Sequence, residues 1–130
     1  MMFSHVMVGT NDPDKARAFY DATLGELGIV GQHTPRGAFY GMPEGGMFGV
    51  VVPRNDQPAT FANGGTIGFK AQGPEQVDAW YNAGMARGGS DEGAPGPRDY
   101  GPVPIYAAYM RDPEGNKLCA ICVTGDSKAS

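Results

Sequence analysis

Apolar and polar positions divide the chain into short alternating segments and two longer amphipathic ones. Residues 3–9 alternate as a half-buried strand does. Asn11-Asp12-Pro13 then supplies a helix N-cap followed by proline at the first helical position, and apolar residues recur at three- and four-residue steps until Gly25 or Gly28. Turn residues then separate three short strand candidates, at 29–33, 37–42 and 47–52. The first half of the chain therefore predicts the order β-α-β-β-β.

The second half of the chain repeats this order. A displacement of 61 positions aligns Pro13 with Pro74 and Phe19-Tyr20 with Trp80-Tyr81, and one of 70 aligns Pro43-Glu44-Gly45 with Pro113-Glu114-Gly115. Two matches in the same order, each inside the same type of element, indicate a duplicated module. The second copy is predicted to contain a strand at 65–71, a helix at 75–87, and strands near 89–91, at 105–110 and at 117–123.

The two copies differ most between residues 90 and 102. The change of offset places nine extra residues in or near this stretch, which is the richest in glycine, proline and charge. We expect a loop here, long enough to close over the mouth of a cavity. The alternative is a plain solvent-exposed connection.

Two modules with one amphipathic helix each predict an α+β fold. The modules span about residues 3–53 and 64–123 and form a single domain over residues 1–130, because a chain of this length buries enough surface to fold without a metal or a disulfide. We expect the two tandem βαβββ modules to form a curved mixed sheet around a cavity, with the helices on the outer face.

Composition and charge narrow the classes of partner. The apolar run at 105–110 is far shorter than the roughly 18 residues that span a membrane, so no membrane partner is expected. Fourteen acidic residues against ten basic ones give a net charge of -4, and no basic block is present to bind phosphates, which argues against nucleic acid. The N-terminus lacks the pattern of an export signal, which favours a cytoplasmic protein.

At this point the sequence resembles the vicinal oxygen chelate superfamily, which includes glyoxalase I, extradiol dioxygenases, fosfomycin-modifying enzymes and bleomycin-resistance proteins. The resemblance covers nearly all of residues 3–123. It rests on Ser4-His5-Val6, Ala18-Phe19-Tyr20 and Arg111-Asp112-Pro113-Glu114-Gly115-Asn116. These marks are specific for the superfamily but not for one activity. The resemblance is also compatible with a homodimer, since relatives often pair modules between chains.

The resemblance implies four positions at which relatives hold a divalent metal, on the first and fourth strands of each module. Here they are His5, Gly49, Thr66 and Cys119. Only His5 keeps the expected ligand type, because glycine has no side chain, threonine is a poor ligand and cysteine selects softer metals. We therefore expect no metal cofactor. The alternative is a partial zinc, nickel, manganese or iron site at His5 and Cys119, completed by waters or by His33, Asp91, Glu92 or Asp99.

Without a metal, His5 and Cys119 keep other roles open. His5 is expected to line the cavity with one ring nitrogen hydrogen-bonded, for instance to Thr66, or to act as a general base near its ordinary pKa of about 6.5. Cys119 is a candidate nucleophile if His5 lowers its pKa. Cys119 and Cys122 spell C-x-x-C, but strand residues three apart point to opposite faces, so the two thiols are not expected to pair.

Other residues are candidates for binding a ligand. Met7 and Thr66 share the inward parity of His5 and Cys119. In the loop region, Arg98 is expected to pair with a ligand carboxylate or phosphate, and Tyr100 or Tyr106 to stack on an apolar group. The sequence does not decide whether Phe39 and Tyr40 line the pocket or fill the core.

The residues and the family resemblance lead to three hypotheses about function. We expect a small-molecule-binding protein of the bleomycin-resistance type with a degraded metal site. The second is a metal-dependent lyase or isomerase related to lactoylglutathione lyase, or a dioxygenase-like enzyme. The third is a metal-independent enzyme that uses His5 as acid and base, with Cys119 or Thr66. The sequence leaves open whether the protein is catalytic and which small molecule is its partner.

Overall fold

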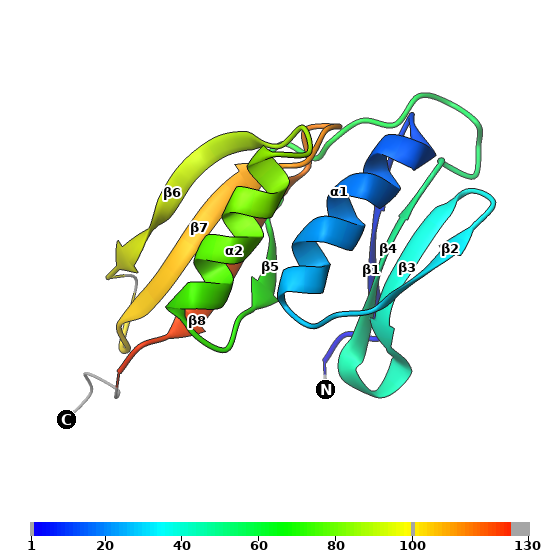
Figure 1. Cartoon of the computed structure of the whole chain (residues 1–130). Helices are drawn as coiled ribbons and strands as arrows, with labels where there is room; N and C mark the ends of the chain where they lie inside the picture. The colour runs from blue at the N-terminus through cyan, green and yellow to red at the C-terminus, as the bar shows by residue number, and fades with distance from the viewer. Residues whose placement is uncertain (1, 100, 126–130) are drawn as a thin grey trace.

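The computed structural model describes residues 2–99 and 101–125 and contains one strand–helix pattern twice. Both modules show the predicted order β-α-β-β-β, with one short 3-10 turn added in the first (Figure 1). In chain order the elements are β1 (His5–Gly9), α1 (Pro13–Glu26), β2 (Gly31–Thr34), β3 (Gly37–Met42), η1 (Pro43–Gly45), β4 (Gly46–Val51), β5 (Ile67–Lys70), α2 (Pro74–Met85), β6 (Ser90–Arg98), β7 (Ile105–Arg111) and β8 (Lys117–Val123).

The strands form two four-stranded sheets rather than one continuous sheet. Their orders are β1-β4-β3-β2 and β5-β8-β7-β6. In each sheet the first strand pairs with the fourth in parallel, and the remaining pairs are antiparallel. Figure 1 places β1 and β5 in the middle of the molecule, between the outer strands β2 and β6. The fold is therefore α+β as predicted, and β1 and β5 are the inner edge strands of the two sheets.

Strand register supports the duplication independently of the sequence match. Met7 pairs with Gly49 across β1 and β4, and Gly68 pairs with Cys119 across β5 and β8. These positions are related by the displacements of 61 and 70. Gly49 and Cys119 also pair with equivalent residues of β3 and β7. The two modules therefore share their hydrogen-bonding scheme as well as their element order.

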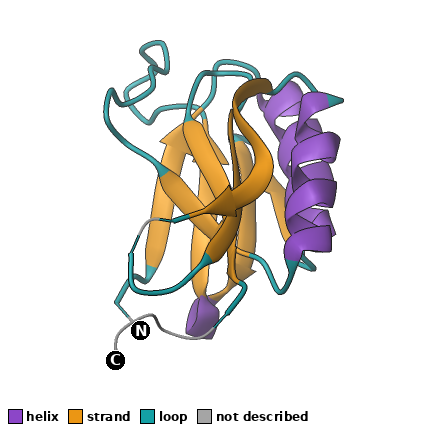
Figure 2. Cartoon of the chain, turned by 90° about the vertical axis from the view of Figure 1, so that its left-hand side faces the viewer, coloured by secondary structure: helices purple, strands orange, loops and turns teal. Residues whose placement is uncertain are grey.

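Both helices begin at prolines that the sequence marks. The Asp12 side chain accepts a hydrogen bond from the Lys15 backbone N–H at 3.1 Å and caps α1, while Pro13 and Pro74 occupy the first helical positions. Figure 2 shows both helices on one side of the strands. Among the described residues, neither helix is long and apolar enough to cross a membrane.

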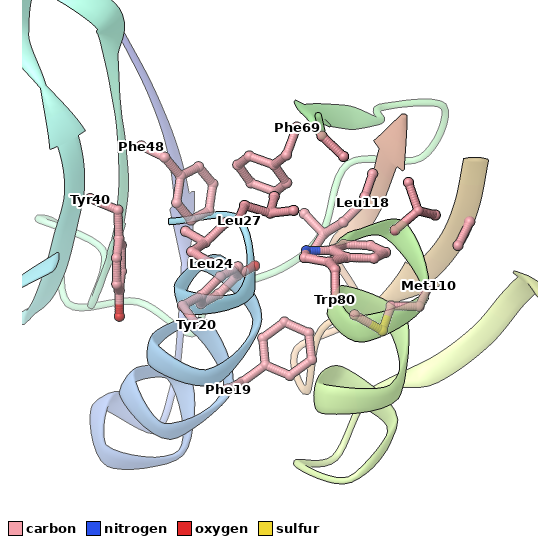
Figure 3. Close-up of a cluster of buried hydrophobic side chains, with 14 of the residues drawn as sticks. Phe19, Tyr20, Leu24, Leu27, Tyr40, Phe48, Phe69, Trp80, Met110 and Leu118 are labelled. Carbon is pink, nitrogen blue, oxygen red and sulfur yellow. The ribbon is translucent and has the colours of Figure 1, made fainter. Parts of the chain in front are cut away.

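The core lies between the helices and the sheets. The apolar stripes of α1 and α2 face each other and the helix-side residues of both sheets (Figure 3). A Cβ at Gly84 would overlap with the side chain of Met110, so this glycine lets α2 lie close to β7. Trp80 is fully buried, and its indole N–H has no hydrogen-bond partner among the described residues. Buried apolar side chains from both modules therefore form the contact between them.

The stretch predicted as a loop at 90–102 is mostly strand, which corrects that expectation. β6 runs to Arg98 and pairs with β7, with register shifts on both sides of Gly93. An edge strand tolerates the prolines at 95 and 97, because a missing N–H on its free side breaks no ladder bond. The extra residues therefore lengthen a hairpin instead of forming a lid.

The turn between β7 and β8 fastens the second module to the first through a buried carboxylate. Asp112 Oδ1 accepts the backbone N–H groups of Glu114 and Asn116, each at 2.9 Å. Asp112 Oδ2 accepts the Tyr20 hydroxyl of α1 and the Asn116 side-chain amide. Burial and this carboxylate raise the pKa of Tyr20, so the phenol stays protonated and donates. One aspartate therefore ties a turn of module two to the helix of module one.

Glu114 adds a second set of bonds at the same corner. Its carboxylate accepts the Asn11 backbone N–H and the Asn11 side-chain amide, each at 2.9 Å, and the Thr10 hydroxyl at 3.2 Å. Asn11 also bonds both backbone groups of Ala59, which fixes the connection between the modules. Asp112 and Glu114 together are called the clasp below.

Replacing Asp112 with alanine is expected to destabilise the protein by about 3 kcal/mol. The change leaves the Tyr20 hydroxyl and two Asn116 donors buried without their acceptor. Urea denaturation measures the loss. The matched control is Met42→Ala at the equivalent, exposed position of module one, which should shift the free energy of unfolding by less than about 0.5 kcal/mol. Equal effects of the two variants would contradict the role given to the clasp.

Candidate functional site

Alternation along the strands leaves one face of each sheet without a helix. Val8 packs against the core, whereas the side chains of His5 and Met7 point away from the helices and are exposed. On β8, Leu118 and Cys122 face the core, and Cys119 faces the other way. This helix-free surface is called the open face.

The open face of the first sheet is hollowed over β1, β3 and β4. The hollow, called the cup, has a volume of about 560 Å³. It continues past Met7, Phe39 and Arg54 into a neighbouring depression of about 590 Å³. The residues that line the cup are Ser4, His5, Met7, Phe39, Pro43, Met47 and Arg54. Its walls are therefore mainly apolar, with Ser4, His5 and Arg54 as polar groups.

Arg54 is placed at the cup by the turn that follows β4. Arg36 donates to the carbonyls of Val52 and Pro53 at 3.2 and 2.6 Å and pairs with Asp56 at 3.0 Å. These bonds hold both flanks of Arg54. None of the ion pairs among the described residues involves Arg54. The cup thus has one cation available to a ligand.

His5 is held by its neighbour in the chain. The Ser4 hydroxyl lies 2.7 Å from His5 Nδ1, in hydrogen-bonding contact. The sequence suggested Thr66 as this partner, but Thr66 lies before β5 and is exposed. The contact orients the imidazole and leaves Nε2 as the ring nitrogen for a ligand.

The four metal positions implied by the family resemblance do not fit a divalent ion. A Cβ at Gly49 would lie 2.5 Å from Met7 Sδ and 2.7 Å from Phe39 Cε1. The space for a ligating side chain on β4 is therefore filled by the cup's own residues. Thr66 carries only a hydroxyl, and Cys119 is buried. In the described parts of the chain, no three His, Cys, Asp or Glu side chains lie close enough together to hold a metal ion.

Residues considered as substitute ligands are engaged elsewhere. His33 Nε2 lies 2.8 Å from Asp21 on α1, on the helix side of the sheet. Asp91 accepts the Tyr81 hydroxyl at 2.9 Å, and Glu92 lies 3.5 Å from Arg111. The structure does not bring these side chains to His5.

Cys119 lies on the open face of the second sheet, outside the cup. Burial raises the pKa of its thiol, and the hydrogen bond with the Tyr109 side chain and the Lys117 ammonium offset only part of that rise. A raised pKa keeps the thiol protonated at neutral pH, which is unfavourable for a nucleophile. Cys122 faces the core, so the two free cysteines point to opposite sides of β8, as strand geometry predicts.

The aromatic and basic residues predicted near the second module do not gather at the cup. The Tyr106 hydroxyl donates to Asp78 of α2 at 2.7 Å, so this side chain lies on the helix side of the second sheet, away from the cup. Arg98 donates to the carbonyls of Ala94 and Pro97 of its own strand. Tyr100 lies outside the described residues.

Part of the cup could be predicted from the sequence. His5 and Met7 were expected to share one face of the sheet, and both line the cup. Phe39 lines the cup, whereas Tyr40 is buried and donates to Asp21 at 2.7 Å, which separates two residues that the sequence left undecided. Met47 and Arg54 were not predicted. Met47 pairs with His5 in register, so strand pairing was the signal that could have identified it.

Gly49→Ala is expected to destabilise the protein by about 1–3 kcal/mol, because the new methyl group overpacks Met7 and Phe39. Adding Met7→Ala should recover part of the loss, since it removes the sulfur and its methyl group. Gly45→Ala, where a Cβ meets nothing within 4 Å, is the control. Urea denaturation of the four proteins measures these effects. No recovery in the double variant would show that Met7 does not fill the Gly49 position.

Alkylation of Cys119 by iodoacetamide is expected to reach half its maximal rate at a pH above the ordinary thiol range of about 8.5. Because the pKa of Cys119 is raised, less of this residue than of an ordinary thiol is present as thiolate at neutral pH. Site-resolved mass spectrometry separates Cys119 from Cys122, and glutathione is the control. A midpoint below that of glutathione would identify an activated thiol instead.

Comparisons with known proteins support this architecture. The chain is similar to a glyoxalase/bleomycin resistance protein from Albidiferax ferrireducens T118, with 52% identity, a TM-score of 0.89, and coverage of 94% of this chain and 99% of that one. A glyoxalase-related enzyme from Fulvimarina pelagi has a similar fold at 16% identity (TM-score 0.73, 98% and 99% covered). A glyoxalase/bleomycin resistance protein/dioxygenase family enzyme from Burkholderia phytofirmans PsJN also does, at 22% identity (TM-score 0.67, 93% and 98% covered). The search of curated proteins found no match.

A family model gives the broadest assignment. It matches residues 2–120, which is nearly the whole described chain. The chain belongs to the Glyoxalase/Bleomycin resistance protein/Dioxygenase superfamily.

Proposed function

We propose that the protein binds a small aromatic anion in the cup without a metal ion. The observation that carries this proposal is the filled position at Gly49, where Met7 and Phe39 occupy the space that a metal-ligating side chain would need. The same two side chains then form the apolar floor of a binding site. A pocket with apolar walls and a few placed polar groups suits a small, partly apolar molecule.

Each part of the cup has a role in such binding. The ring of Phe39 and the thioethers of Met7 and Met47 offer polarizable surface to an aromatic ring. Arg54 supplies the positive charge for a carboxylate, and Arg36 fixes the turn that carries it. His5, oriented by Ser4, adds one hydrogen bond. The ligand class is therefore an aryl carboxylate or a molecule of similar shape and charge.

Calorimetric titration with 2-naphthoate tests the proposal. Arg54→Gln is expected to weaken binding about tenfold, because it removes a charge-assisted hydrogen bond. Arg87→Gln, at an exposed arginine beyond α2, removes the same charge away from the cup and should leave binding unchanged. Equal affinity of wild type and Arg54→Gln would contradict the assignment of the cup.

Metal content separates this proposal from a metal-dependent reaction. The purified protein is incubated with nickel, zinc, manganese or ferrous iron, dialysed, and measured by elemental analysis. We expect no stoichiometric retention, and 2-naphthoate affinity should be the same with and without chelator. Retention of one ion per chain that disappears in His5→Ala would overturn the metal-independent proposal.

A further inference from the structure

Duplication makes two corners of the molecule equivalent: the turn after β7 with the end of β1, and the turn after β3 with the end of β5. Only the first of these corners is closed. At one junction, the clasp turn of module two docks on the corner after β1, and the Asn116 side chain reaches the Gly9 carbonyl at 3.4 Å. The equivalents of Asn116 and Gly9 are Gly46 and Lys70. These two residues instead line a cleft of about 550 Å³. The turn of module one therefore leaves open the corner that the clasp fills at the other junction.

The chemistry of the turn explains why this junction stays open. Asp112, which is 4% exposed and accepts four hydrogen bonds, has Met42 as its counterpart, and Met42 is 62% exposed. Gly46 occupies the position equivalent to Asn116 and has no side chain that could bond to the end of β5. Module one thus lacks the side chains that would fasten its turn to β5.

The cleft, called the seam cleft below, has apolar walls contributed by both modules. Val6, Leu24 and Phe48 come from module one, and Ile67 and Phe69 from module two. Phe3, Val30 and Met42 extend this apolar surface at the rim and are 64%, 82% and 62% exposed. A contiguous apolar surface of this kind on a soluble chain marks a binding site.

One charged side chain stands at the seam cleft. Lys70 is the only charged residue among the described residues that line it, although the chain as a whole carries a net charge of -4. Tyr40 is the only other lining residue with a polar side chain, and its hydroxyl is engaged by Asp21. The seam cleft therefore offers a long apolar surface and one cation, and it lacks the side-chain hydrogen-bonding groups that a sugar or a nucleotide requires.

We propose that the seam cleft binds an aliphatic monocarboxylate of medium chain length, with the carboxylate at Lys70 and the chain between the two modules. The site is distinct from the cup: Met47 is the one residue that lines both, and Arg54 and Met7 line the cup but not the seam cleft. This proposal does not rest on ligand binding at the cup.

Methionine methyl groups report on the two sites separately. Protein labelled with ¹³C at the methionine methyl groups is titrated with decanoate and followed by NMR. The Met42 signal is expected to move with saturation, while the Met7 signal in the cup stays in place. Movement of Met7 without Met42 would place the ligand in the cup and overturn the proposal. A Met42 signal that moves on protein dilution but not with decanoate would assign the cleft to a second copy of the chain and would also overturn it.

Substitution of Lys70 tests the charge. Lys70→Gln is expected to weaken decanoate binding about fivefold, as for a partly exposed ion pair, and Lys70→Arg to retain it. Lys15→Gln, at an exposed lysine in the first turn of α1, is the matched control and should leave affinity unchanged. Decanol, which lacks the charge, should bind wild type and Lys70→Gln equally. Equal decanoate affinity of wild type and Lys70→Gln would contradict the assignment of Lys70.

Discussion

Packing of α1 against α2 holds together two modules whose strands belong to separate sheets. A Cβ at Gly84 of α2 would lie 3.1 Å from Thr23 Cγ2 of α1, so this glycine lets the two helices approach closely, and Trp80 of α2 is buried in the same core. The clasp reinforces this seam from one end, because Asp112 receives the Tyr20 hydroxyl from α1. The relative position of the two open faces, and hence any site formed on them, depends on this apolar contact and on the hydrogen bonds of the clasp.

Much of the fold follows from periodicity alone. Alternation and helical spacing identified both modules, and residues that the two displacements align occupy equivalent positions in the strand register of the two sheets. β6 was misjudged for a physical reason. Glycine and proline at Gly93, Pro95 and Pro97 are typical of loops, but an edge strand with bulges tolerates them. Whether a strand will lie at an edge is decided by the order of strands in the sheet, which composition does not reveal.

The site was less predictable because it depends on contacts across strands. Parity placed His5 and Met7 on one face, but it could not show that Met7 and Phe39 would fill the position of Gly49. The place of Arg54 depends on bonds that Arg36 makes to a turn 16 to 20 residues further along the chain. The face of Tyr106 follows from its pairing with Cys122, which the sequence analysis did not use. Residue type predicts the role of a side chain only where the strand pairing, and hence the face of the sheet, is also known.

Trp80 gives the molecule an internal optical probe. It is the single tryptophan of the chain, is fully buried where the modules meet, and has no hydrogen-bond partner for its indole N–H among the described residues. Indole emission shifts to longer wavelength when water reaches the ring. Separation of the modules would therefore change the colour of the emitted light, whereas rearrangements confined to the outer strands would leave it unaltered. Tryptophan fluorescence can thus report separation of the modules in the unlabelled protein.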